Sequence, residues 1–162
     1  MNQMEFDVLP VINGIKQCPG YTDYSQVEKF GERCSFGPRC SFGQWCSFGE
    51  GCRFGEECRF GEGCSFGEGC RFGEECVYNN HKLRPGYPLL QMNGAGSANR
   101  GTNAWNTEDG IIVRCGCFEG NLAAFRAQVR KTHGDTSKHT RVYLGFANLC
   151  ALQFDRPEEI ES

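Results

Sequence analysis

The chain of 162 residues has no apolar run near the roughly 20 residues that a membrane-spanning helix needs. Its start, MNQMEFDVLPVINGIKQCPG, lacks the basic n-region, long apolar core and small-residue cleavage site of a signal peptide. It also lacks a basic excess, because the net charge is −3 and the isoelectric point is about 5.7. The sequence therefore predicts a cytoplasmic protein with no membrane segment, and nucleic acid is not an expected partner.

Histidine is scarce as well, with three residues in the chain. Few candidates remain for general acid–base catalysis, and no nucleophile lies in a recognisable catalytic pattern. Cysteine, in contrast, is abundant, with twelve residues. In a reducing cytosol we expect these to be free thiols that pack as small apolar side chains rather than disulfides.

The spacing of the cysteines is their informative property. From Cys34 to Cys76 the chain repeats Cys-x-Phe-Gly-x-x seven times and ends with an eighth cysteine. Zinc ligands usually occur as pairs two to four residues apart, so a step of six predicts neither a metal site nor any other cofactor. A short fixed period instead indicates stacked units that cannot bury an apolar face alone.

Each unit predicts a short strand followed by a corner. The first and third residues point to the same side of an extended segment, and the glycine that follows favours a bend. Three strands close a triangular coil of about 18 residues, and coils stack about 4.8 Å apart. Residues 18 apart should therefore form columns along the stacked coils. At the corners we expect acidic columns beside a basic column, one with Glu56 and Glu74 and another with Glu57 and Glu75. The predicted columns are Cys34, Cys52 and Cys70; Phe36, Phe54 and Phe72; and, on the surface, Ser35, Arg53 and Arg71.

This pattern resembles the hexapeptide-repeat family of left-handed parallel β-helices. The units CSFGEG and CRFGEE match the family's pattern in register, with Cys64 and Cys70 as the small residue and Phe66 and Phe72 at the aliphatic position. The resemblance implies a homotrimer or another homo-oligomer with parallel coil axes. Many members are acyl- or acetyltransferases, which makes His81 the one candidate base, although an ordinary surface histidine is the favoured interpretation.

The last third of the chain predicts a small ββαα domain. AWNTEDGIIVRCGCF indicates a β-hairpin that turns at 108–110, and NLAAFRAQVRKTHG indicates a helix with Asn121 as N-cap and Gly134 as its stop. HTRVYLGFANLCALQF predicts a second helix before an acidic tail that we expect to fray. The apolar face expected on this second helix carries Val142, Phe146, Leu149 and Cys150.

The fold class expected is mainly β with α: a short left-handed parallel β-helix of about three coils followed by a small ββαα domain. The expected divisions are an N-terminal cap at 1–27, the β-helix at 28–81, a linker at 82–103, the ββαα domain at 104–155 and an acidic tail at 156–162.

Two features of the ββαα domain suggest chemistry or origin. WNTEDGIIVRCGCFEG, from Trp105 to Gly120, resembles the C-terminal portion of uncharacterised phage and prophage proteins, and this resemblance brings no activity. Cys115 and Cys117, with His133 and His139, can be drawn as a zinc site. Because Cys-x-Cys with two distant histidines lacks the usual ligand spacing, we interpret the two cysteines as core residues.

No convincing catalytic constellation is present, so we predict a non-enzymatic binding protein of phage or prophage origin. It would inhibit a host defence by sequestering a nucleotide signal or by blocking a host protein. The alternatives are a hexapeptide-repeat acyltransferase and a structural virion component. A solvated polar face is the default interpretation of the basic residues, and a phosphate site is the alternative. The candidate ligand-binding residues are Arg53, Arg59, Arg71, Trp45, Trp105, Arg126, Arg130, Lys131, Arg141 and Tyr143.

Overall fold

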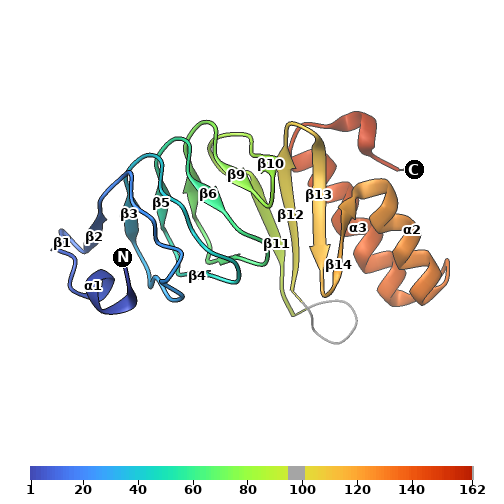
Figure 1. Ribbon diagram of the computed structural model, residues 1–162. Helices are drawn as coiled ribbons and strands as arrows, with labels where there is room; N and C mark the ends of the chain where they lie inside the picture. Colours follow the sequence, from blue (N-terminus) through green and yellow to red (C-terminus); the bar gives the residue numbers. More distant parts are fainter. Residues whose placement is uncertain (95–100, 162) are drawn as a thin grey trace. The chain divides into compact units, whose positions relative to one another are not determined.

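The structure is a computed structural model in which residues 1–94 and 101–161 are described. It is a mixed α and β fold with more strand than helix, and it divides into two compact units (Figure 1). We call Met1–Pro88 the N-terminal unit and Leu89–Ser162 the C-terminal unit. Among the described residues, no helix is long and apolar enough to cross a membrane.

The N-terminal unit consists of short strands that return to the same face every 18 residues, visible as successive coils in Figure 1. These strands are β3 (Cys34–Phe36), β4 (Ser47–Phe48), β5 (Arg53–Phe54), β6 (Arg59–Phe60), β7 (Ser65–Phe66), β8 (Arg71–Phe72) and β9 (Val77–Tyr78). The parallel pairs are β3 with β5, β5 with β8, β4 with β7 and β6 with β9. The predicted register is confirmed, since Phe36, Phe54 and Phe72 align, and so do Ser35 and Arg53.

Columns of aromatic rings form the core of this unit. Rings within a column stack nearly parallel, with centroids 5.2 Å apart for Phe36 and Phe54 and 4.9 Å apart for Phe48 and Phe66. Rings of neighbouring columns meet edge to face, as Phe54 and Phe60 do at 4.7 Å and 88°. A strand spacing of about 4.8 Å suits offset aromatic stacking, which gives a physical reason for phenylalanine where the resembled family has aliphatic residues.

The cysteines of the repeat lie at the corners, next to the ring columns. Cys34, Cys52 and Cys70 are all buried, as predicted for one inner column. All twelve cysteines lie in the described residues and carry free thiols. A hydrogen bond with Cys46, together with burial, raises the pKa of the Cys64 thiol, so this thiol stays protonated and can donate.

The corners depart from the expected role of glycine. A bend was expected at the fourth residue of each unit and a turn at the last two. The turn lies at the last two, and the sixth residue adopts a left-handed backbone, with φ of 67° at Gly51 and 59° at Glu57. The fourth residue is glycine for a steric reason instead. A Cβ at Gly67 would lie 2.5 Å from the backbone nitrogen of Glu50 in the preceding coil.

The coils begin earlier than predicted. β2 (Ile15–Cys18) pairs in parallel with β3, and the ring of Tyr24 stacks on Phe42 with 5.5 Å between centroids. The cap expected over 1–27 is therefore confined to α1 (Gln3–Asp7) and β1 (Val11–Ile12). Phe6 of α1 is buried, and its ring contacts Phe30, which begins the ring column that continues to Phe48.

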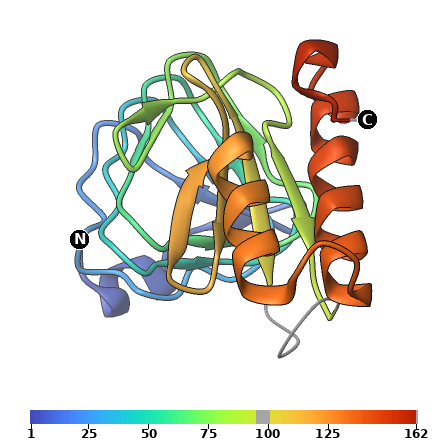
Figure 2. The same cartoon turned by 90° about the vertical axis from the view of Figure 1, so that its right-hand side faces the viewer.

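The C-terminal unit is an antiparallel sheet with two helices against one face (Figures 1 and 2). Its elements are β11 (Leu89–Met92), β12 (Thr102–Thr107), β13 (Gly110–Cys115), β14 (Phe118–Asn121), α2 (Leu122–His133), α3 (Lys138–Gln153) and the 3-10 helix η2 (Pro157–Glu159). The predicted hairpin and both helices are confirmed, and Asn121 caps α2 by accepting from the amide of Ala124.

Other expectations for this half of the chain are corrected. The sheet has the order β11-β12-β13-β14, because β11 and β14 flank the predicted hairpin. β11 and the start of β12 fall in the linker expected at 82–103, of which 95–100 lie outside the described residues. Of the face predicted for α3, Phe146 and Cys150 are buried, whereas Leu149 is 50% exposed and Tyr143 takes its place in the core.

The acidic tail does not fray. Arg126 donates from Nη2 to the carbonyl of Glu159, 2.6 Å away, and Asn148 donates to the carbonyl of Glu161, 2.8 Å away. Arg130 forms an ion pair with the Glu161 carboxylate. The tail therefore packs on α2 and α3 because two helix arginines and an asparagine satisfy its backbone and carboxyl oxygens.

Candidate functional site

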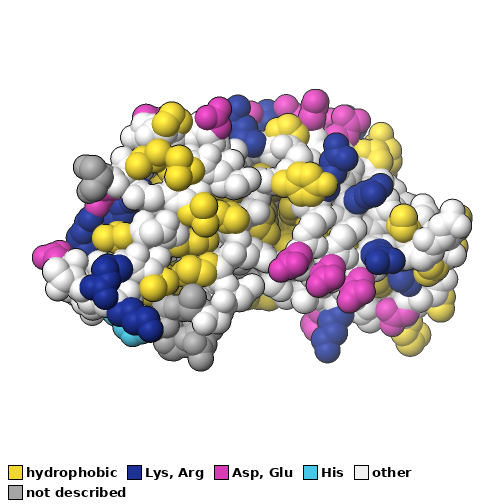
Figure 3. All heavy atoms as spheres, turned by 180° about the vertical axis from the view of Figure 1, so that it is seen from behind, with side chains coloured by type: hydrophobic (Ala, Val, Ile, Leu, Met, Phe, Trp, Pro, Cys, Tyr) yellow, Lys and Arg dark blue, Asp and Glu magenta, His cyan; other side chains and the backbone are white. Residues whose placement is uncertain are grey.

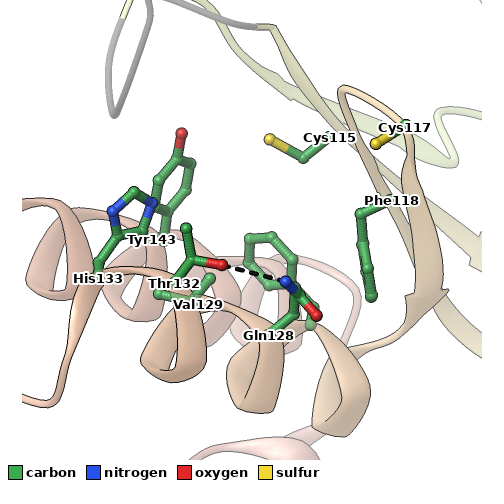
Figure 4. Close-up of a pocket in the computed structure, with 9 residues that line it drawn as sticks. Cys115, Cys117, Phe118, Gln128, Val129, Thr132, His133 and Tyr143 are labelled. Carbon is green, nitrogen blue, oxygen red and sulfur yellow. Dashed lines mark hydrogen bonds between the residues drawn. The ribbon is translucent and has the colours of Figure 1, made fainter.

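A cavity of about 150 Å³ opens in the C-terminal unit between the β13–β14 hairpin and the helices α2 and α3 (Figure 4). The hairpin contributes thiols, both helices contribute rings, and α2 adds polar groups. The side chains that define the cavity are Cys115, Phe118, Phe125, Gln128, His133 and Tyr143.

The hairpin places its two cysteines differently. Cys115 pairs with Phe118 across the turn, and Gly116 supplies the positive φ of 60° that the turn requires. The fully buried Thr102 of β12 donates its hydroxyl to Cys115 Sγ, 3.2 Å away. Both cysteines line the cavity, but Cys115 is half-buried and Cys117 is exposed, which corrects the assignment of Cys117 to the core.

Aromatic side chains from the hairpin and from both helices line the cavity. Phe125 meets Tyr143 edge to face, with centroids 5.9 Å apart and planes at 89°. The ring of Phe118 lies 5.9 Å from Phe125, and the imidazole of His133 stacks on Tyr143 at 5.8 Å and 20°. Figure 4 shows the Tyr143 hydroxyl and the Cys115 thiol directed into the same space. Phe125 and Tyr143 are only 2% and 3% exposed, so they form the inner lining of the cavity, and the half-buried Phe118 exposes more of its ring.

Polar groups of α2 stand at the rim. Gln128 donates from Nε2 to Thr132 Oγ1, 3.0 Å away, which leaves its amide oxygen as an acceptor (Figure 4). His133 lies at the end of α2, and His139 at the start of α3, with 5.4 Å between their ring centroids. This contact brings the ends of the two helices together beside the cavity.

The structure separates the predicted ligand-binding residues of this unit into distinct groups. Tyr143 lines the cavity, while Trp105 is fully buried and offers no surface to a ligand. Arg126 is 7% exposed and binds Asn148 and the tail, so it is a structural residue. Arg130 is engaged by the tail as well, as described above. Lys131 and Arg141 are exposed.

The candidates of the N-terminal unit lie on different faces of the coils. Arg53 and Arg71 share one face, and Arg59 lies on another, where it lines a surface hollow of about 400 Å³. Beside Arg59 the hollow has two ion pairs, namely Arg39 with Glu57 at 2.9 Å and Lys82 with Glu75. The indole of Trp45 is 64% exposed and lies over Gly63.

The remaining chemical candidates have simpler surroundings. Within the described residues, no group of three or more His, Cys, Asp or Glu side chains is arranged to hold a metal ion, so Cys115, Cys117, His133 and His139 are not brought together as ligands. His81 lies in β10 (His81–Lys82), which pairs antiparallel with β9 and ends the coils. Its imidazole is half-buried.

No protein-family model, characterised protein or solved structure matches the chain. The function is therefore argued from the cavity itself. The sequence identified Tyr143 as a ligand candidate, but not Gln128 or Thr132. Their spacing of four residues places them on one face of α2, a signal that a polar helix face alone does not distinguish from ordinary solvation.

Proposed function

We propose that the protein is a non-enzymatic binding protein that sequesters a nucleotide in the cavity of the C-terminal unit. The observation that carries this proposal is the wall of aromatic rings formed by Phe118, Phe125 and Tyr143, with Gln128 and Cys115 at its edge. A cavity of about 150 Å³ has room for one six-membered aromatic ring. A base ring fits inside, and the sugar and phosphate extend through the open side.

Cationic side chains of the adjoining helix ends are the candidates for the phosphate. Lys138 directly precedes His139, whose ring lies 5.4 Å from that of His133, whereas Lys131, two residues before His133, lies on another side of α2. Both lysines are exposed, and Figure 3 shows Lys and Arg side chains next to a histidine on this unit. Ammonium groups bind phosphate oxygens through charge-assisted hydrogen bonds. The site thus combines a surface for base stacking with positive charge for an anion.

The proposal includes a biological setting. The stretch from Trp105 to Gly120 resembles phage and prophage proteins, and the free thiols of the repeat suit the reducing cytoplasm of a host cell. In that setting the nucleotide is a signal of a host defence, which the protein removes from solution. The predicted alternatives are blocking of a host protein, acyl transfer with His81 as base, and a role in the virion.

The N-terminal unit is, in this proposal, a left-handed parallel β-helix of the hexapeptide-repeat kind. Support comes from the 18-residue register between β3, β5 and β8 and from the inward Cys and Phe columns. Coils of this kind present flat faces to solvent. We therefore include self-association, as a homotrimer or another homo-oligomer, in the proposal.

Ligand binding is tested by native mass spectrometry of protein purified gently from its host, followed by calorimetry with mononucleotides and cyclic dinucleotides. Retained mass of nucleotide size, reproduced with the pure compound, supports the proposal. Retained coenzyme A instead supports the transferase, and a bound host polypeptide supports the blocking route. Failure of every nucleotide to bind in both measurements overturns the proposal.

A matched pair of variants locates the binding site. Thr132→Trp places an indole at the rim of the cavity, and Ala127→Trp places one on an exposed position of α2 that does not line it. We expect Thr132→Trp to weaken nucleotide binding at least tenfold and Ala127→Trp to leave it unchanged. Equal affinities in both variants would place the ligand elsewhere.

The biological setting is tested by deleting the gene from the phage. We expect reduced growth on hosts that carry a nucleotide-signalling defence and normal growth on hosts without it. Unchanged growth on every defended host removes the defence role, whereas calorimetry decides nucleotide binding separately.

A further inference from the structure

Besides the acidic corner columns with Glu56 and Glu74 and with Glu57 and Glu75, the N-terminal unit has one basic ladder and one further acidic ladder. Arg53 and Arg71 are in register on neighbouring strands. Successive corners are joined by backbone hydrogen bonds, such as the 2.9 Å bond from Gly51 to the carbonyl of Glu68, which aligns an acidic ladder. Figure 3 shows acidic side chains following one another along this unit. The acidic ladder consists of Glu32, Glu50 and Glu68, all exposed.

Neither ladder is neutralised within the described residues. The ion pairs of Arg39 with Glu57 and of Lys82 with Glu75 use none of the ladder residues. Glu50 lies three residues before Arg53, and Glu68 lies three residues before Arg71, yet among the described residues neither couple forms an ion pair. Like charges that face each other on neighbouring strands repel, so both ladders oppose the stacking of the coils.

We propose that this face binds a second copy of the chain about a two-fold axis parallel to the coil axis. Arg53 and Arg71 of one copy then meet Glu50 and Glu68 of the second copy, and the symmetry repeats these contacts in the opposite direction. Glu50 and Arg53 belong to the same coil, so the facing charges are level. A two-fold contact of this kind is self-complementary. The inference rests on the self-association proposed above and specifies its surface.

A second copy accounts for both ladders, whereas a bound anion accounts for only one. A phosphate or an acidic polypeptide would neutralise Arg53 and Arg71 and would leave the acidic ladder unpaired. The second copy carries the opposite charges with the same repeat of one coil, because both ladders arise from the same 18-residue period. Matching of sign and spacing therefore favours a copy of this chain as the occupant.

The contact is polar, which determines how it responds to salt. Exposed ion pairs are individually weak, and dissolved ions screen them over about 10 Å at 0.1 M ionic strength and about 3 Å at 1 M. We therefore expect a reversible dimer whose dissociation constant rises at least tenfold between about 0.05 M and about 0.5 M NaCl.

Charge reversal tests the pairing by sedimentation equilibrium of the full chain. Arg53→Glu with Arg71→Glu should make the protein monomeric at low salt, and so should Glu50→Arg with Glu68→Arg. Combining all four substitutions in one chain should restore the dimer, because the ladders exchange signs. An equimolar mixture of the two double variants should also form a dimer, since one copy is then acidic and the other basic on this face.

The control is Arg59→Glu with Lys29→Glu, which makes the same change of charge on other faces of the coils. We expect this variant to remain dimeric at low salt. A monomeric or trimeric wild type, or a quadruple variant that stays monomeric, overturns the two-fold contact. Nucleotide calorimetry on the monomeric Arg53→Glu, Arg71→Glu chain separates this inference from the proposed function, because the cavity lies in the other unit.

Discussion

The Cys64 thiol donates a hydrogen bond to the carbonyl oxygen of Gly43 in the preceding coil, with 3.2 Å between Sγ and O. The same relation recurs through the repeat, with distances of 3.4 Å from Cys70 and 3.3 Å from Cys76 to the equivalent carbonyls. The cysteines were predicted as small apolar core residues, and they are also donors. A thiol serves both roles because it satisfies a buried carbonyl and costs less to desolvate than a hydroxyl.

Replacing Cys64 with alanine should lower the free energy of unfolding by about 1 to 2 kcal/mol, since the variant loses the thiol donor and leaves a small void. Urea denaturation followed by circular dichroism measures the change. Cys117→Ala is the matched control, because Cys117 is exposed, and it should leave the free energy of unfolding unchanged. Equal stability of the two variants would show that the corner carbonyl does not need a donor.

Glycine at the fourth position should be far less replaceable than glycine at the sixth. A Cβ at Gly67 would lie 2.5 Å from Glu50 N and 2.6 Å from Gly49 C, and these backbone atoms cannot move without breaking the coil contacts. We expect Gly67→Ala to lower the free energy of unfolding by about 3 kcal/mol or more.

The control for that substitution is Gly69→Ala. At Gly69 the added methyl meets open space, and the cost is the left-handed φ of 72°, which is about 1 kcal/mol. Thermal unfolding of both variants compares the two costs directly. Similar melting temperatures would contradict the steric explanation of the fourth-position glycine.

The ring columns should depend on aromatic stacking rather than on apolar volume alone. Phe54 stacks between Phe36 and Phe72, with centroids 5.2 and 5.0 Å away. Phe54→Leu keeps the residue apolar but removes these ring contacts, so we expect a loss of about 1 to 3 kcal/mol. Urea unfolding measures the loss of free energy of unfolding. The control is Tyr21→Leu, which removes a ring that is 74% exposed and should change the free energy of unfolding little. A neutral Phe54→Leu would show that the columns tolerate any apolar side chain.

The docking of the C-terminal tail should depend on pH. The hydrogen bond from Arg130 lowers the pKa of Glu161 below its ordinary value of 4.5. Because the folded-state pKa is the lower one, the contribution of this carboxylate is fully present above pH 4.5 and is lost as the pH falls through the folded-state value. Amide chemical shifts of Ile160 and Glu161, recorded by NMR during acid titration, report the loss.

Glu161→Gln is the test of that assignment. It removes the titrating carboxyl but keeps the backbone carbonyl that accepts from Asn148. The shift of the Ile160 amide should then no longer follow an acidic titration. If the titration persisted unchanged in Glu161→Gln, another group would control the tail.

The period of the sequence predicted the arrangement of the coils well, because each unit repeats the same local forces. The coil that contains Cys18 and Tyr24 was missed, since it keeps only the inward positions of the pattern and loses the flanking cysteines. In the C-terminal unit, capping residues such as Asn121 located the helices. The pairing of β11 with β12 was not predicted from the sequence, because the residues around β11 carry no local signal that identifies the strand it pairs with.

The site was less predictable than the fold. Basic residues were grouped by charge, but the structure uses Arg126 to bind the tail, a contact with a backbone carbonyl that side-chain composition does not reveal. Tyr143 was identified for its chemistry and not for its neighbours. The cavity depends on how a hairpin and two helices meet, and this is a property of packing between elements distant in the sequence.

The 18-residue register limits how this chain can change in length during evolution. An insertion of 18 residues adds one coil and leaves every later side chain on its own face. An insertion of six residues between Arg53 and Arg71 copies one complete unit, yet it shifts every later residue to the next face of the coil. Arg71 would then no longer align with Arg53. Gains and losses in related genes should therefore come in multiples of three units wherever the faces matter for function.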